Sequence, residues 1–299
     1  MNDRSIRLTR PDGASAAYRV RAPGTPEGAP LLLIHGLASN GSRFAEFVER
    51  TALAAHHALI RVDLRGHGDA MTRRRIGIDL WCDDLAAVLD AEGARAAIVV
   101  GHSLGAQVAL HFAQRHPQRC AALVLIDPVF RSALHGRRLW LAQAVPLLRL
   151  AARLVRALNA IGLHRGALPP LDLRALDSAA RRALGSPEAE RAFIAQYSSM
   201  RADLKHVPLA VYLQDLAEMF APAPLPRTLG VPVLALLSTG ATFADAAAMR
   251  AALAGPNVTV QTIDCQHWPL TERPDEVRQA IERWCVALPP VASASCPAH

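Results

Sequence analysis

Five consecutive residues have the types and spacing of a nucleophilic site. Gly101-His102-Ser103-Leu104-Gly105 follows an apolar run, 96–100, and precedes a segment, 106–113, whose apolar residues recur at helical spacing. The pattern G-x-S-x-G between a buried strand and a helix is typical of a nucleophile elbow, in which the serine stands on a sharp turn. The glycines leave room for the strand and the helix to approach each other. The pattern predicts an activated serine at position 103.

Attack by Ser103 on a carbonyl would create an oxyanion, which needs two hydrogen-bond donors. The backbone N–H of Leu104 lies at the N-terminus of the predicted helix, where it would point at the developing charge. We expect the second donor to be the N–H of Leu37, because His35-Gly36-Leu37 directly follows the apolar run 31–34. An ordinary loop between a strand and a helix is the alternative for this segment.

A serine needs a base that accepts its proton and a third group that orients the base. Among the 12 histidines, His267 is the best placed, because it follows the last predicted strand, 258–263. The loop that contains it lies at the same edge of the sheet as Ser103. His102 adjoins the serine but points elsewhere from the turn, and we interpret His67 as a structural loop residue.

The acidic member of the triad has two candidates. Asp127 directly follows the predicted strand 121–126, and its loop opens to the same edge of the sheet. Asp245 comes late after the strand 231–237, near a helix N-terminus, where it could equally be an N-cap. We favour Asp127 and keep Asp245 as the alternative. Asp127-Pro128 could also serve only to turn the chain into the next segment.

The elements that must position these residues alternate along the chain. Apolar runs typical of strands buried on both faces alternate with segments of helical periodicity, which indicates an α/β fold with a mostly parallel sheet and helices on both faces. The expected strands are 5–10, 14–21, 31–34, 58–62, 96–100, 121–126, 231–237 and 258–263. The alternation stops between 129 and 228. We expect a helical cap there, inserted into a core that consists of residues 1–128 and 229–299.

The motifs resemble those of the α/β-hydrolase superfamily over nearly the whole chain. Besides the elbow, the resemblance rests on His35-Gly36 and on the segments 63–68 and 267–274. The order Ser, Asp, His along the chain is also that of the superfamily. The resemblance implies the α/β-hydrolase fold and a serine esterase that cleaves carboxylic esters through an acyl-enzyme. Epoxide hydrolases and haloalkane dehalogenases share the architecture but need an aspartate nucleophile.

The position of the predicted acid resembles that in some small bacterial esterases of this fold. In those proteins the acid follows the strand next to the nucleophile strand, and a Ser or Thr occupies the more usual acid position. The resemblance implies Asp127 as the acid and Thr242 as the hydroxyl substitute. The same triad also serves hydrolases of lactones, amides and carbon–carbon bonds and acyltransferases. A ligand-binding protein without catalysis is the alternative outside the enzymes.

The composition limits the class of protein and its partners. A hydrophobic fraction of 51% with 20% charged residues describes a folded chain with a large core. The net charge of +7 comes from scattered arginines without an aromatic-interleaved basic cluster, so we expect no nucleic-acid partner. No apolar run reaches the ~18 residues that span a bilayer, and the first residues lack the apolar stretch of a signal peptide. The 5 cysteines show no paired short spacing. We therefore expect a cytoplasmic protein with reduced thiols, no metal, no organic cofactor and no stable membrane association.

The predicted cap begins with a dense basic stretch. Residues 129–171 include no acidic side chain, but they include Arg131, Arg137, Arg138, Arg149, Arg153, Arg156 and Arg165. A helix is expected over 147–163, with its arginines on one face and Leu148, Val155 and Leu158 on the other.

Two interpretations of this helix remain. In the first, the apolar side packs over the site and the basic side is solvated. In the second, the helix belongs to a lid that contacts lipid transiently. The expected substrate is a small-molecule ester with an apolar acyl or alcohol part.

Overall fold

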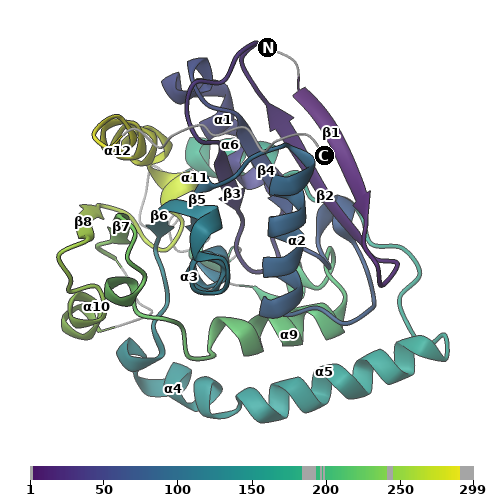
Figure 1. The fold of residues 1–299 in the computed structure, drawn as a ribbon. Coiled ribbons are helices and arrows are strands. Elements are labelled where there is room, and N and C mark those ends of the chain that lie inside the picture. The colour runs from purple at the N-terminus through teal and green to yellow at the C-terminus, as the bar shows by residue number, and fades with distance from the viewer. Residues whose placement is uncertain (1–2, 184–192, 196, 198, 241–244, 290–299) are drawn as a thin grey trace.

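A computed structural model of the chain describes residues 3–183, 193–195, 197, 199–240 and 245–289. Their backbone forms one 8-stranded sheet between layers of helices (Figure 1). The strands are β1 (Asp3–Thr9), β2 (Ser15–Arg21), β3 (Leu31–Ile34), β4 (Leu59–Asp63), β5 (Ala97–His102), β6 (Cys120–Ile126), β7 (Val233–Ser238) and β8 (Val258–Ile263). The α-helices are α1 (Ala45–Arg50), α2 (Ile78–Ala91), α3 (Leu104–Arg115), α4 (Gly136–Gln143), α5 (Val145–Ala160), α6 (Leu173–Ala183), α8 (Met200–Asp203), α9 (Leu209–Met219), α10 (Ala246–Ala252), α11 (Pro269–Glu272) and α12 (Pro274–Val286). Short 3-10 helices are η1 (Gly41–Phe44), η2 (Ala52–Ala55), η3 (Gly68–Ala70), η4 (Pro117–Arg119), η5 (Arg131–Ala133) and η6 (Pro226–Thr228).

The strand order in the sheet is β1-β2-β4-β3-β5-β6-β7-β8. The pairs β1–β2 and β2–β4 are antiparallel, and every pair from β4 to β8 is parallel. In a parallel arrangement the carboxyl ends of the strands meet at one edge of the sheet, so the loops after β3, β5, β6, β7 and β8 lie near one another. The predicted α/β class with a mostly parallel sheet is confirmed.

The strand β3 shows why helices must cover both faces of the sheet. Successive side chains of a strand point to opposite faces. Leu32 and Ile34 pack with residues of α2 and α3, whereas Leu31 and Leu33 pack with residues of α1 and α12. All four side chains are fully buried. The continuous apolar run in the sequence therefore reflects a strand with a helical layer on each side, as predicted.

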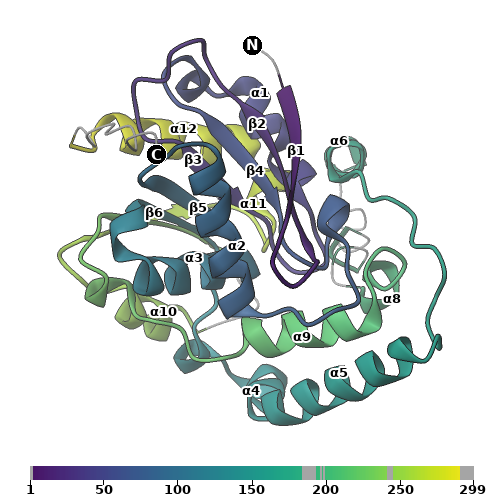
Figure 2. The same cartoon turned by 45° about the vertical axis from the view of Figure 1, so that its right-hand side comes forward.

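The described residues between β6 and β7 form helices and loops but no strand. In both ribbon views α9 lies between α5 and the rest of the molecule, and α5 runs along the outer edge (Figures 1 and 2). None of the helices in the described ranges is both long and apolar enough to cross a bilayer. The boundaries of a cap at 129–228 and of a core at 1–128 and 229–299 stay a prediction.

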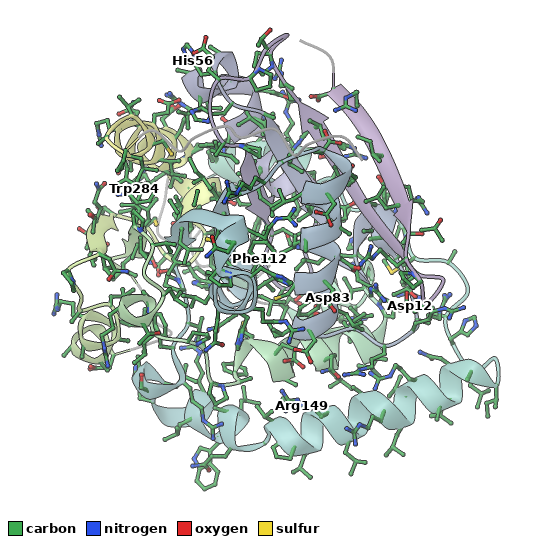
Figure 3. The ribbon with its side chains drawn as sticks, viewed as in Figure 1. Asp12, His56, Asp83, Phe112, Arg149 and Trp284 are labelled. Carbon is green, nitrogen blue, oxygen red and sulfur yellow. The ribbon has the colours of Figure 1, made fainter. Side chains whose placement is uncertain are left out.

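The orientation of α5 differs from the first interpretation of this helix. Its exposed side carries large apolar residues, including Leu158 at 47% exposure. Arg149 lies on the side that faces α9, where its guanidinium pairs with Glu218 at 3.3 Å (Figure 3). The expectation of an apolar side packed inward therefore holds for Leu148, which packs beside Ala217 and Phe220, and fails for Leu158. The expectation of a solvated basic side fails in part for Arg149, because the acidic Glu218 on the facing helix pairs with its half-exposed guanidinium.

A buried ion pair attaches α6 to the strand-bearing part of the chain. The Nη1 atom of Arg43, in η1, donates to both carboxylate oxygens of Asp177, in α6, at 2.7 Å and to Thr271 Oγ1 at 2.6 Å. The hydroxyl of Tyr197 also donates to Asp177 at 2.8 Å. The Arg43 and Asp177 side chains are each only 6% exposed. Charges buried to this degree are stabilised only while they stay paired.

Removal of one partner of this pair should be costly. We expect Asp177→Ala to lower the free energy of unfolding by about 3 kcal/mol, because it leaves the Arg43 guanidinium buried without a carboxylate. The matched control is Arg174→Ala in the same helix, which removes an exposed pair with Glu49 and should cost less than about 1 kcal/mol. Urea denaturation of both variants measures the difference. Equal losses in the two variants would contradict the structural role of the buried pair.

Candidate active site

Ser103 stands on a tight turn between β5 and α3. Its backbone has φ 53° and ψ −114°, a left-handed conformation that a non-glycine residue adopts only when the surrounding structure enforces it. A Cβ atom on Gly101 would lie 2.2 Å from the carbonyl oxygen of Gly105, and one on Gly105 would lie 2.3 Å from that of Ile34. Both glycines are therefore required by the close approach of backbone segments, as the motif predicts.

The structure brings the three predicted triad residues together. His267, in the loop after β8, has its Nε2 atom 3.1 Å from the Ser103 hydroxyl oxygen. Its Nδ1 atom is hydrogen-bonded to the carboxylate of Asp127, which directly follows β6. Ser103 and Asp127 are each 5% exposed. The side chains thus form one line of hydrogen bonds, from hydroxyl to imidazole to carboxylate, at the carboxyl edge of the sheet.

The surroundings of Asp127 determine which imidazole nitrogen carries the proton. Burial by itself would raise the pKa of Asp127, but His267 and the hydrogen bonds from Ser238 outweigh burial and hold the pKa below its ordinary value. An ionised carboxylate can only accept hydrogen bonds, so Nδ1 of His267 must be the protonated nitrogen. Nε2 then has a free lone pair, which accepts the hydroxyl hydrogen of Ser103. This arrangement prepares the imidazole to act as a base toward the serine.

The two predicted oxyanion donors flank the serine. Leu104 is the first residue of α3, and Leu37 and Gly36 line the same cavity as Ser103. A Cβ atom on Gly36 would lie 3.4 Å from Ser103 Cβ, so a larger residue there would crowd the serine. Within the described ranges neither N–H of the two leucines donates to a backbone acceptor outside regular elements. Their role as an oxyanion hole stays a prediction.

A cavity of about 620 Å³ opens above Ser103 and His267. A volume of this size is typical of pockets for small molecules. The apolar residues that line it are Leu37, Val129, Leu134, Leu141, Leu216, Met219, Phe220 and Trp268. Polar and charged residues line the cavity as well, among them Arg43, His135, Arg138, Tyr197, Asp203 and Tyr212. The helices between β6 and β7 contribute Tyr197, Tyr212 and Met219 to this lining.

Comparison with known proteins identifies the family of the chain. The model of the alpha/beta hydrolase family matches residues 31–280, which is most of the chain. The chain belongs to the alpha/beta hydrolase family. The pimeloyl-[acyl-carrier protein] methyl ester esterase of Xanthomonas campestris is 33% identical over 272 residues, which cover 88% of this chain and 97% of that protein. Lipase LipV of Mycobacterium tuberculosis is 40% identical over 117 residues, which cover 38% of this chain and 42% of the lipase.

Solved structures show the same fold at lower sequence identity. A thermophilic esterase from Thermogutta terrifontis superimposes with a TM-score of 0.68 at 22% identity, over 95% of this chain and 98% of the esterase. An enol-lactonase from Burkholderia xenovorans gives a TM-score of 0.68 at 19% identity, over 94% of this chain and 100% of the lactonase. These neighbours establish the architecture of this alpha/beta hydrolase, and they leave the bond that it cleaves to the site itself.

The alternative acid lies elsewhere in this hydrolase. The carboxylate of Asp245 accepts a hydrogen bond from the backbone N–H of Ala248 at 2.7 Å and caps α10. Its N-cap interpretation therefore describes the observed contact, and Asp127 is the carboxylate beside His267. The expected hydroxyl substitute, Thr242, lies outside the described residues.

Ser238 is a site residue that the sequence analysis did not assign. Its hydroxyl donates to Asp127 Oδ1 at 2.8 Å, and its backbone N–H donates to the same oxygen at 3.1 Å. Ser238 ends β7, the strand next to β6 in the sheet. That position could have indicated its role, because the residues that end adjacent parallel strands meet at the same edge of the sheet. The two donors hold the carboxylate with one oxygen directed at His267.

The other histidines near the site hold its loops in place. The Nε2 atom of His102 donates to the backbone carbonyl of His267 at 3.3 Å, and burial together with His267 lowers the pKa of His102 to about 3. His35 is fully buried, and its Nε2 accepts the N–H of Leu64 at 3.0 Å. His67 is fully buried, and its Nε2 atom lies 2.8 Å from Oδ2 of Asp215 in α9 rather than beside the serine. The expectation that His67 is structural matches its contact with Asp215. His102, which was expected to point elsewhere, instead lines the cavity, with its ring 5.7 Å from that of His267.

Substitution of each candidate acid by asparagine should show which carboxylate takes part in catalysis. We expect Asp127→Asn to lower kcat by on the order of 10³–10⁴-fold, because an amide would favour the wrong imidazole tautomer. Asp245→Asn, the matched control, should leave kcat within about twofold, since its carboxylate only caps a helix. Ser238→Ala should lower kcat by about tenfold through a less well-held carboxylate. Initial rates on p-nitrophenyl acetate measure all three. A loss confined to Asp245→Asn would refute the assignment of Asp127.

Proposed function

We propose that this alpha/beta hydrolase cleaves carboxylic esters with Ser103 as the nucleophile. In this proposal His267 is the general base, Asp127 orients and stabilises the imidazolium, and the N–H groups of Leu37 and Leu104 bind the oxyanion. The observation that carries the proposal is the line of hydrogen bonds from the Ser103 hydroxyl through His267 to the buried Asp127 carboxylate, at the floor of the cavity.

The reaction follows from this arrangement in two halves. His267 Nε2 takes the proton of Ser103 as Oγ attacks the ester carbonyl, and the oxyanion that forms lies toward the two backbone N–H groups. The imidazolium then protonates the alkoxide leaving group, and the acyl group remains on Ser103. Water, deprotonated by the same imidazole, attacks the acyl-enzyme and releases the carboxylic acid. Residues of this chain supply every protein group in this scheme.

The cavity supports a substrate with an apolar acyl or alcohol part. Its walls are rich in leucine and aromatic side chains, and apolar chains gain free energy when they leave water for such walls. The Xanthomonas relative is a methyl ester esterase, so methyl esters belong to the proposed class. A core of residues 1–128 and 229–299 with a cap at 129–228, a cytoplasmic location and transient contact of the cap with lipid are parts of the same proposal.

Chemical labelling tests the nucleophile directly. A fluorophosphonate should label the wild-type protein, and Ser103→Ala should remove both the label and catalysis, with a loss in kcat on the order of 10⁴-fold. His267→Ala should lower both to a similar extent, because the hydroxyl loses its base. Mass spectrometry locates the label, and hydrolysis of p-nitrophenyl esters of increasing acyl length measures activity. Activity of Ser103→Ala above a tenth of the wild type would eliminate the proposal. Turnover of lactones in preference to all linear esters would instead move the function to lactone hydrolysis.

Asp203 should make substrate binding depend on pH. This carboxyl group lines the cavity, and burial, together with the nearby Asp215, raises its pKa to about 7. Below that pH the group is neutral and suits an apolar chain, whereas above it the cavity gains a charge that an apolar chain would have to desolvate. We expect KM for a medium-chain ester to rise several-fold between about pH 6 and about pH 8, and Asp203→Asn to abolish the rise. Steady-state kinetics across this pH range measure the effect. The same dependence of KM on pH in both proteins would show that Asp203 is not its cause.

A further inference from the structure

The exposed side of α5 and the neighbouring part of α4 form an outer apolar face. We define this outer apolar face by Trp140, Leu147, Leu150, Leu154, Leu158 and Ile161, which are 73%, 68%, 51%, 58%, 47% and 73% exposed. The five positions on and just after α5 are three or four residues apart, so they follow one side of the helix. Folded chains rarely leave so many large apolar side chains side by side in water unless another surface covers them.

We propose that the outer apolar face docks on an anionic lipid surface. The helix α5 would lie in the plane of the interface, with its leucines among the acyl chains and the charged side away from them. Amphipathic helices that bind in this way combine a leucine- or tryptophan-rich side with arginines on the opposite side. Both kinds of residue are present, since Arg149, Arg153 and Arg156 of α5 line a groove together with Gln214 and Glu218 of α9.

Charge decides between lipid and the alternative partner, a second copy of this chain. Residues 129–171 include arginines but no acidic side chain. Two copies joined through the outer apolar face would bring two such segments together, and their like charges would oppose association. Anionic head groups attract the same segment through its exposed arginines, among them Arg153 and Arg165, because each arginine near a negatively charged surface adds favourable electrostatic energy. The lipid surface is therefore the partner that fits both the apolar side chains and the charge.

The outer apolar face lies beside the cavity that contains Ser103. Helix α4 contributes Arg138 and Leu141 to the wall of that cavity, and it carries Trp140 on the outer apolar face. Leu141 is itself 36% exposed, so the cavity wall continues to the surface at this helix. If the proposed ester hydrolysis is correct, docking would place the cavity next to esters dissolved in the lipid. The docking step itself does not depend on that activity.

Vesicle binding by the full-length protein tests the docking. Vesicles of phosphatidylcholine alone are compared with vesicles that contain equal parts of phosphatidylcholine and phosphatidylglycerol. We expect the protein to sediment with the anionic vesicles and to be released as the salt concentration rises, because salt screens the arginines. The combined substitutions Leu150→Ser, Leu154→Ser and Leu158→Ser should lower the partition coefficient at least about tenfold.

The fluorescence of Trp140 gives a second readout. The other three tryptophans, Trp81, Trp268 and Trp284, are buried or half-buried. Anionic vesicles should therefore shift the emission of the wild type to shorter wavelength, and Trp140→Phe should remove the shift. The matched control combines Val260→Ser and Val286→Ser, which replace exposed apolar residues of β8 and α12 at 41% and 81% exposure. This control should bind vesicles as the wild type does.

The outcomes separate docking from catalysis and from self-association. The leucine variant should hydrolyse p-nitrophenyl acetate in vesicle-free buffer at the wild-type rate, which shows that it is folded. Failure of the wild type to bind anionic vesicles, or equal binding by the leucine variant, would overturn the proposal. A dimer seen by light scattering in the wild type, lost in the leucine variant and accompanied by no vesicle binding, would assign the face to a second copy and also overturn it. A wild type that binds vesicles but hydrolyses no ester would leave docking intact and refute the proposed function.

Discussion

The buried contact between the Asp127 carboxylate and the His267 imidazole is the interaction on which the site depends. A carboxylate that is 5% exposed is tolerated only when hydrogen bonds and an opposite charge compensate for the lost hydration. Asp127 follows β6, and the compensation comes from the ends of two other strands: Ser238 ends β7, and His267 follows β8. The same contact fixes the tautomer of the imidazole. One electrostatic requirement therefore links the register of the sheet to the direction of proton transfer.

The register of the parallel strands meets this requirement. His102 pairs with Ile126 across β5 and β6, Ile126 with Leu236 across β6 and β7, and Ser238 with Ile263 across β7 and β8. Each strand therefore releases its loop at nearly the same level, and the side chains that follow can reach one another. The left-handed backbone at Ser103 and Asp127, with φ of 53° and 47°, turns both side chains out of the sheet at that level. Conformations of this kind persist where the surrounding contacts enforce them.

This geometry explains which features could be predicted from the sequence. The sharp boundaries of the apolar runs give the strand ends, and the rule that parallel strands end at one edge then places Ser103, Asp127 and His267 together. Ser238 was not predicted as a site residue, because a serine at a strand end has no distinctive chemistry by itself. Its role follows only from its contact with the carboxylate that follows the neighbouring strand. The ambiguity between Asp127 and Asp245 has the same origin. Both follow a strand, and only the three-dimensional structure shows that the second carboxylate binds its own helix N-terminus.

The orientation of α5 could not be predicted from the spacing of its apolar residues, for a different reason. Its sequence has apolar residues on both sides, with Leu148 toward α9 and Leu150 toward the exterior, so the pattern defines two faces without deciding which one is inside. Tertiary packing decides: Val145 and Leu148 of α5 pack beside Ala217 and Phe220, and the Arg149–Glu218 pair lies on the same inner side. The cavity walls depend on the same helices, whereas the reacting groups come from the sheet. The reacting groups of this hydrolase can therefore be predicted from short sequence motifs. The shape of its cavity, and with it the choice of substrate, depends on tertiary contacts between segments far apart in the chain.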